Sequence, residues 1–140
     1  MFLPFLKKET IITRADQLIV RGSPIHGLGV FSAIDYQKGA IIETAPIILG
    51  NQQDYEMLKY TDMHDYYFLL TDKNYPIAIG LGFSSWYNHA APANAVYLIN
   101  KKKLTIQIKA YQFIAAGEEI TLNYHGKPDN LAPITFNNVL

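Results

Sequence analysis

Short apolar runs rich in β-branched residues alternate with turn residues along most of the 140-residue chain. Runs of this kind, bounded by Gly, Pro, Asn or Asp, predict β-strands. We expect such strands at 17–21, 66–70, 76–79 and 95–99. The run 40–49 is expected to form two strands broken at Pro46, because proline cannot donate a hydrogen bond to a neighbouring strand.

Two runs nearer the C-terminus alternate between apolar and polar residues. Leu104, Ile106 and Ile108 share one face of 104–109, and 120–124 alternates in the same way. Such alternation is typical of a strand with one buried face. By contrast, 51–64 fits either a helix or irregular structure.

These patterns together give about ten short strands, little helix and no internal repeat. They predict a mainly β protein of several small sheets, organised as a single domain over 1–140. The tail 125–140 carries apolar residues almost to its end, so we expect it to fold back over the body of the domain.

The composition argues against several classes of function and site. Twelve basic residues balance 12 acidic ones, so no positive field favours direct binding of nucleic acid. The absence of cysteine excludes disulfides, a thiolate zinc site and a cysteine nucleophile. His26, His64 and His125 are scattered along the chain and lack a carboxylate at ligand spacing, so no metal is expected. No apolar run is long enough to cross a bilayer, and we expect a cytoplasmic protein without membrane contact.

Candidate chemistry is concentrated in 79–97, which combines two glycines, Trp86–Tyr87, Asn88–His89 and Asn94. Glycines allow close approach of the backbone, and adjacent amide and imidazole groups offer several hydrogen bonds. This mixture predicts a polar binding loop. A second Gly-x-Gly, 27–29, fits either a tight turn between strands or a backbone that contacts a ligand. It lacks the third glycine and the helix of a dinucleotide-binding fingerprint.

Three pieces of the chain, in this order, resemble the SET domain of protein-lysine methyltransferases. They are His26-Gly-Leu-Gly-Val-Phe-Ser32, Trp86-Tyr-Asn-His-Ala-Ala-Pro-Ala-Asn94 and Gly117-Glu-Glu-Ile-Thr-Leu-Asn-Tyr124. The resemblance covers about 17–124 and is closest to the minimal, stand-alone SET proteins without cysteine-rich flanking segments. It implies a β-clip fold of small sheets in which two segments thread past each other as a C-terminal pseudoknot.

The resemblance also implies a reaction, a cofactor and residue roles. The reaction is methyl transfer from S-adenosyl-L-methionine (S-adenosylmethionine) to the ε-amine of a lysine in a protein or peptide. Backbone groups of Gly27, Leu28 and Gly29, together with Asn88 and His89, are implied to bind the donor, and Phe136 to stack on its adenine.

Three further residues have implied roles. Asn94 would lock the pseudoknot, and Tyr124 would orient the amine beside the methyl group. Tyr97 falls where an aromatic residue sets how many methyl groups fit, and its hydroxyl favours monomethylation. A narrow apolar channel suits this chemistry, because desolvation favours the neutral amine that must attack.

The sequence departs from the family pattern beside the Asn-His pair. Ser85 stands for the usual arginine, Ala90 and Ala91 replace a Ser-Cys pair, Ala93 stands where proline precedes the second asparagine, and Asn123 replaces an acidic residue. The alanines remove hydrogen bonds that anchor the loop, so they bear on donor affinity more than on fold.

Two other functions stay open from sequence alone. One is a SET-fold module of weak activity that binds a peptide or the donor, and the other is an unrelated β-clip domain for a small ligand. The substrate protein is not identified, although Asp54, Glu56, Asp62 and Asp65 offer a local acidic groove for a basic tail. Homodimerisation stays open, and action on histones would imply a nuclear location.

Overall fold

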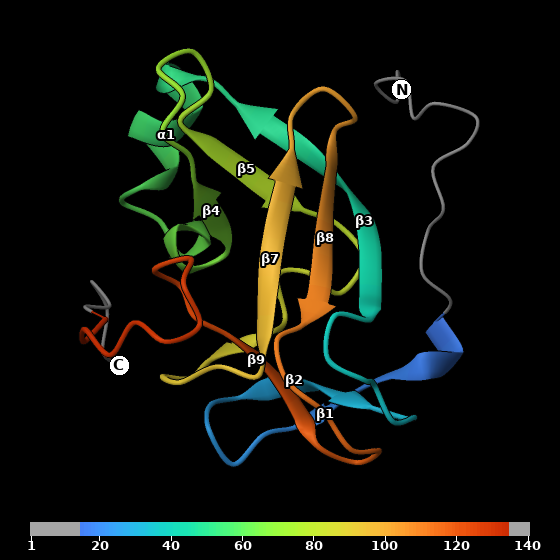
Figure 1. The fold of residues 1–140 in the computed structure, drawn as a ribbon. Helices are drawn as coiled ribbons and strands as arrows, with labels where there is room; N and C mark the ends of the chain where they lie inside the picture. Colours follow the sequence, from blue (N-terminus) through green and yellow to red (C-terminus); the bar gives the residue numbers. More distant parts are fainter. Residues whose placement is uncertain (1–14, 135–140) are drawn as a thin grey trace.

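The computed structural model describes residues 15–134, which form two small β-sheets with little helix. Figure 1 shows the larger sheet above and the smaller one below it. The strands are β1 (Leu18–Gly22), β2 (Leu28–Ser32), β3 (Ile41–Gly50), β4 (Tyr67–Leu69), β5 (Ile77–Gly80), β6 (Asn88–His89), β7 (Ala95–Asn100), β8 (Thr105–Ala110) and β9 (Glu119–Leu122). The helical elements are η1 (Ala15–Gln17), α1 (Gln52–Leu58) and η2 (Asp62–Asp65).

The larger sheet has the strand order β4-β5-β3-β8-β7, and β3 is its central strand. The prediction that Pro46 breaks this region is wrong, because β3 runs through it. Residues 41–46 pair with β8, and residues 47–50 pair with β5 on the other side. Pro46 lies where the partner changes, so its missing N–H group does not interrupt either ladder.

The smaller sheet has the order β1-β2-β9-β6, with β9 between two strands that are distant in sequence. β9 pairs antiparallel with β2 and parallel with β6. The expected alternation over 120–124 is therefore wrong: Ile120, Thr121, Leu122 and Asn123 are all buried. A strand covered on both faces has no solvent side for polar residues, so the buried Thr and Asn must bond within the protein.

Two local predictions, a loop at Asn88–His89 and a strand that includes Leu104, differ from the structure. Asn88 and His89 form β6 and not a loop, because they pair with Thr121 and Leu122 of β9. Leu104 lies in the β7–β8 turn with a φ of 52°, ahead of β8, where Ile106 and Ile108 are fully buried as expected.

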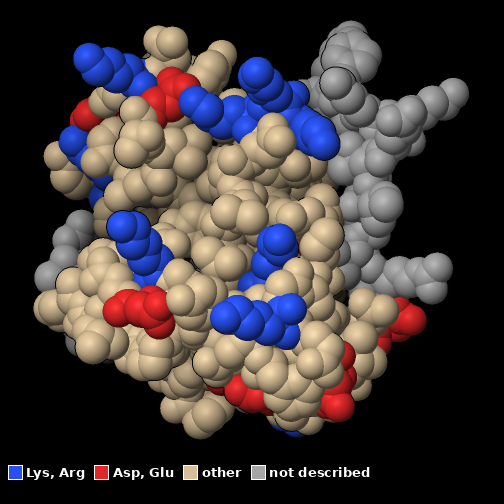
Figure 2. All heavy atoms as spheres, viewed as in Figure 1, with Lys and Arg blue, Asp and Glu red and all other residues tan. Residues whose placement is uncertain are grey.

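The helical part confirms that 51–64 contains helix. Asn51 caps α1 by accepting from the N–H of Asp54, whose carboxylate accepts from the N–H of Asn51 in return. α1 lies at the edge of the larger sheet, above β4 (Figure 1). Basic and acidic side chains are interspersed on the face seen in Figure 2, with lysines gathered at its upper end where β7 turns into β8.

Candidate functional site

An aromatic cavity of about 230 Å³ opens beside the junction of the two sheets. Its walls come from η2, β4, the segment before β6, β7 and the residues after β9. The lining residues are His64, Asp65, Tyr66, Tyr67, Phe68, Leu69, Ser84, Ser85, Tyr87, Tyr97, Leu122, Tyr124, His125 and Ile134. No lysine or arginine is among them, so the cavity places aromatic faces and a carboxylate, but no permanent cation, around its occupant.

Tyr124 lies two residues beyond the end of β9, with its phenol at the cavity. The hydroxyl donates to the carbonyl of Tyr87 at 2.9 Å, which fixes the direction of the phenol. Burial raises the pKa of Tyr124 to about 12, with smaller contributions from Asp65 and Tyr66. The phenol is therefore neutral at physiological pH and acts as a hydrogen-bond donor.

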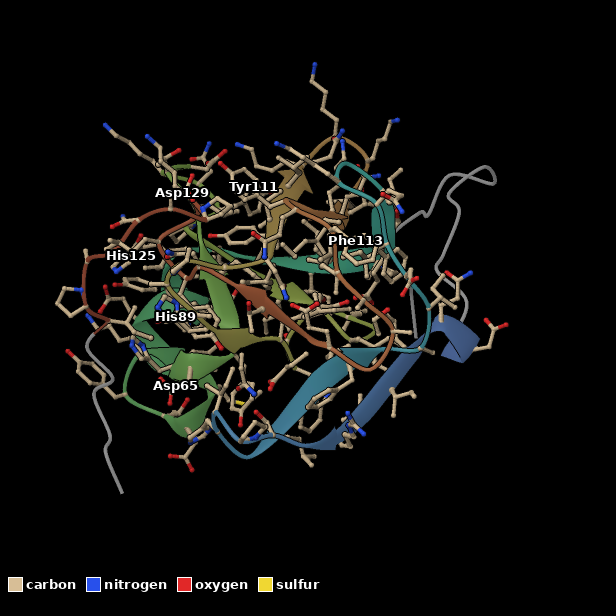
Figure 3. All side chains as sticks on the ribbon, turned by 60° about the horizontal axis from the view of Figure 1, so that its bottom comes forward. Asp65, His89, Tyr111, Phe113, His125 and Asp129 are labelled. Atoms are coloured by element: carbon tan, nitrogen blue, oxygen red, sulfur yellow. The ribbon has the colours of Figure 1, made fainter. Side chains whose placement is uncertain are left out.

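His89 holds the backbone of Tyr124. Its Nδ1 accepts from the N–H of Tyr124 at 3.1 Å, and its ring packs edge-on against the tyrosine ring with centroids 5.2 Å apart. Burial lowers the pKa of His89, and the neighbouring His125 lowers it further. His89 is thus neutral with its proton on Nε2. Figure 3 shows both histidines and Asp65 on the same side of the molecule.

Asn88 connects the Asn-His pair to the first glycine motif. Its Nδ2 donates to the carbonyls of His26 and Leu28, both at 3.0 Å, and to Oε1 of Glu119 at 2.8 Å. The structure thus brings together residues 60 positions apart, as the resemblance implied. The amide N–H groups of Asn88 hold the glycine turn itself.

The glycine motif forms the turn that opens β2. Gly27 has a φ of 47° with open space where a side chain would be, and Leu28 is half-exposed. At Gly29 an added Cβ would lie 2.1 Å from Glu119 Oε1 and 3.0 Å from Asn88 Nδ2. A side chain at Gly29 would therefore displace the Glu119 carboxylate and press on the Asn88 amide, whereas Gly27 and Leu28 lie toward open space.

Asn94 joins the segment after β6 to β9. Its Nδ2 donates to the carbonyl of Glu119 at 2.8 Å, and its Oδ1 accepts from the N–H of Thr121 at 2.8 Å. The N–H of Asn94 in turn donates to the Thr121 hydroxyl at 3.3 Å. A single buried side chain thus satisfies two backbone groups of the strand that it crosses.

Tyr97 projects from β7 into the cavity, where its ring lies 4.8 Å from that of Phe68. Burial raises the pKa of Tyr97, so this phenol is also neutral. The predicted adenine contact, Phe136, lies outside the described residues.

The described part of the tail is bonded to the body. The N–H of Ala93 donates to the carbonyl of Pro128 at 3.0 Å, and the Tyr111 hydroxyl donates to Asp129 at 2.6 Å. Figure 3 shows Tyr111 and Asp129 near each other at one end of the molecule. That the whole tail, 125–140, folds back over the domain stays a prediction, because the described residues end at Ile134. The single-domain boundary 1–140 also stays a prediction.

Sequence reasoning missed most of the cavity wall. The sequence indicates Tyr66, Tyr67 and Phe68 only as part of a strand, and Tyr87 only as one of an aromatic pair in the predicted binding loop. Their signal was the unusual density of tyrosine around the motifs, ten in the chain. The structure also reduces the proposed acidic groove, because Asp54 caps α1 and Glu56 pairs with Lys59. Asp62 and Asp65 of η2 remain as its carboxylates.

Comparison with known proteins decides the family. The sequence profile of the SET domain matches residues 27–125. The chain belongs to the SET domain family. A Schizosaccharomyces pombe histone-lysine N-methyltransferase specific for H3 lysine-37 is 25% identical over 108 residues, which are 76% of this chain and 72% of the relative.

Two solved structures share the SET fold. A candidate histone methyltransferase from Plasmodium falciparum has a TM-score of 0.65 and 29% identity, over 79% of this chain and 95% of that one. A chain of ctPRC2 in complex with H3K27me3 and H3K27M has a TM-score of 0.60 and 26% identity, over 79% of this chain and 15% of that one.

These findings confirm several predictions made from sequence: the SET family, the mainly β SET fold, and the protein-lysine methyltransferase class. They also exclude an unrelated β-clip domain. Within residues 15–134 no group of acidic or histidine side chains is arranged to hold a metal. No helix in that range is long and apolar enough to cross a membrane.

Proposed function

We propose that this SET domain transfers a methyl group from S-adenosylmethionine to the ε-amine of a lysine in a protein, with Tyr124 at the reacting centre. The observation that carries the proposal is the convergence of three pieces distant in sequence. Asn88 binds the glycine turn, His89 holds the Tyr124 backbone, and the Tyr124 phenol bonds to the carbonyl next to Asn88. They meet beside the aromatic cavity of about 230 Å³.

The residues present fit a cationic donor. S-adenosylmethionine, which SET methyltransferases use, supplies a methyl group on a positively charged sulfur. No lysine or arginine lines the cavity, His89 is neutral, and the aromatic rings offer their electron-rich faces. In the proposal Gly27, Leu28 and Gly29 bind the donor through backbone groups, beside Asn88 and His89, and Phe136 stacks on the adenine.

The chain's own residues prepare the amine. Free lysine has a pKa of about 10.4, and burial among aromatic rings favours its neutral form. Because the Tyr124 proton is donated to the Tyr87 carbonyl, the phenol oxygen accepts from an N–H of the amine and so aims the nitrogen lone pair at the methyl group, while the cavity walls exclude water. The hydroxyl of Tyr97 limits the space beside the amine, which favours monomethylation.

A basic histone tail is the proposed substrate class. Two of the relatives named above are a histone H3 methyltransferase and a complex with histone H3 peptides, and η2, which carries Asp62, places Asp65 in the cavity wall, where acidic groups attract positive charge. On a histone substrate the enzyme acts in the nucleus, whereas another target agrees with the cytoplasmic location expected from sequence. Dimerisation and the absence of direct nucleic-acid binding stay predictions.

The test uses the purified full chain with isotope-labelled S-adenosylmethionine. Calorimetry measures donor binding, and incubation with histone H3 followed by mass spectrometry locates the methylated lysine. Tyr124→Phe removes one hydroxyl from a positioned site, so we expect the rate to fall by about 100-fold or more with the fold retained. Tyr111→Phe is the matched control, because its hydroxyl bonds to Asp129 at the surface.

The outcomes separate the proposed enzyme from its alternative. Donor binding with labelled lysine that disappears in Tyr124→Phe supports the enzyme. Donor or peptide binding without any methyl transfer to H3 or to proteins of a cell lysate favours the weakly active SET-fold module. Absence of donor binding contradicts the proposed site.

A further inference from the structure

A buried carboxylate lies behind the aromatic cavity, outside its lining. Glu43 projects from β3 and is only 2% exposed. Its Oε1 accepts from the N–H of Phe83 and its Oε2 from the hydroxyl of Tyr87, both at 2.7 Å. Burial raises the pKa of Glu43, and these two hydrogen bonds oppose that rise. Neither ion pair found within residues 15–134 involves it, so the two donors are what stabilises the charge.

The chain makes room for this carboxylate with a glycine. Gly82 has a φ of 65°, and an added Cβ would lie 2.5 Å from Glu43 Oε1. Any larger residue would push the carboxylate away from the N–H of Phe83. The second glycine of 80–82, which the sequence marked as a point of close approach, thus faces Glu43.

Tyr87 connects Glu43 to the reacting centre. Its phenol is held by Glu43, and its own carbonyl accepts the hydrogen bond from the Tyr124 phenol at 2.9 Å. The residue is 2% exposed and belongs to the hydrophobic core, where close packing couples a shift of the ring to its backbone. The next residue is Asn88, which binds the glycine turn.

We propose that Glu43 is a positioning residue for methyl transfer: by holding the Tyr87 phenol it fixes the Tyr87 carbonyl, which orients the phenol of Tyr124. The inference rests on the proposed function, because Tyr124 acts on the amine there. Glu43 does not line the cavity and therefore acts only through Tyr87.

The first test is Glu43→Gln, which keeps the side-chain length. The glutamine carbonyl still accepts from the N–H of Phe83, but its NH₂ group faces the Tyr87 hydroxyl, whose proton loses its acceptor. We expect kcat to fall by about 10- to 100-fold, as for a small misplacement at a distance, while both KM values stay within about twofold. Tyr87→Phe carries the same test independently and gives a similar loss.

The double variant E43Q/Y87F tests whether Glu43 and Tyr87 affect Tyr124 through one shared contact or independently. Because both residues act through the same contact, its loss should equal that of either single variant. Tyr111→Phe is the matched control, since it also removes one tyrosine hydroxyl, but the partner of that hydroxyl is Asp129 at the surface. Its kcat should stay at the wild-type value.

A spectroscopic readout separates positioning from simple loss of stability. In protein with ¹³C-labelled tyrosine, the Tyr124 ring signal, assigned with Tyr124→Phe, should shift in Glu43→Gln and Tyr87→Phe but not in Tyr111→Phe. A lowered melting temperature with an unmoved Tyr124 signal overturns the inference, as do additive losses in the double variant. A shifted signal in a protein without any turnover upholds the link to Tyr124 and contradicts only the proposed function.

Discussion

Replacing Asn94 with alanine should weaken the fold at the point where two segments cross. The change leaves the part-buried carbonyl of Glu119 and the buried N–H of Thr121 without their Asn94 partner. Each unsatisfied buried backbone group costs about 1–3 kcal/mol. We therefore expect the free energy of unfolding to fall by about 3 kcal/mol, a large part of the roughly 5–15 kcal/mol that stabilises a domain.

Urea unfolding followed by circular dichroism measures this loss, and a melting curve should shift down by roughly 10 °C. Asn100→Ala is the control, because Asn100 is an exposed asparagine that accepts one hydrogen bond from the N–H of Lys103 in a turn. A surface change of this kind stays within about 0.5 kcal/mol. If Asn94→Ala costs no more than Asn100→Ala, strand pairing alone holds the crossing and the reasoning is refuted.

Three other predictions concern the site. Tyr97→Phe should add dimethylated product by removing the hydroxyl beside the amine, and peptide mass spectrometry that still shows only monomethyl-lysine would contradict this. The pKa of His89 is lowered in the fold, so the unfolded chain binds the proton first. Stability should hence be lost as the pH falls below about 6.5, an effect that calorimetric melts should show reduced in His89→Asn. Gly29→Ala displaces Glu119 and should weaken donor binding about tenfold by calorimetry, whereas Gly22→Ala, which meets open space, should not.

Sequence predicted the parts of the fold that follow from local pattern. The strands around Val96, Ile106 and Ile77 were expected because apolar runs between turns leave few alternatives. The family motifs also indicated correctly that Asn88, the glycine turn and Tyr124 come together. These contacts are made by motif residues that can be recognised in the sequence without knowledge of the fold.

The rest depended on contacts that only the fold supplies. Pro46 was expected to break a strand because proline cannot donate a backbone hydrogen bond. The sequence does not show that the strand paired with β3 changes from β8 to β5 at this residue. Asn88 and His89 looked like a loop because β6 exists only through its pairing with β9. Glu43 looked like an ordinary polar position in a strand, since its role depends on Gly82 and Tyr87, about 40 residues away.

The central place of β9 has a consequence for biosynthesis. β2 and β6 emerge from the ribosome well before Leu122, yet in the sheet each strand pairs with β9, and Val30 pairs with Ile120. A nascent chain that has not yet delivered β9 therefore cannot assemble the glycine turn, Asn88 and Tyr124 into one site. Catalytic competence should arise late and all at once, after translation has passed this strand.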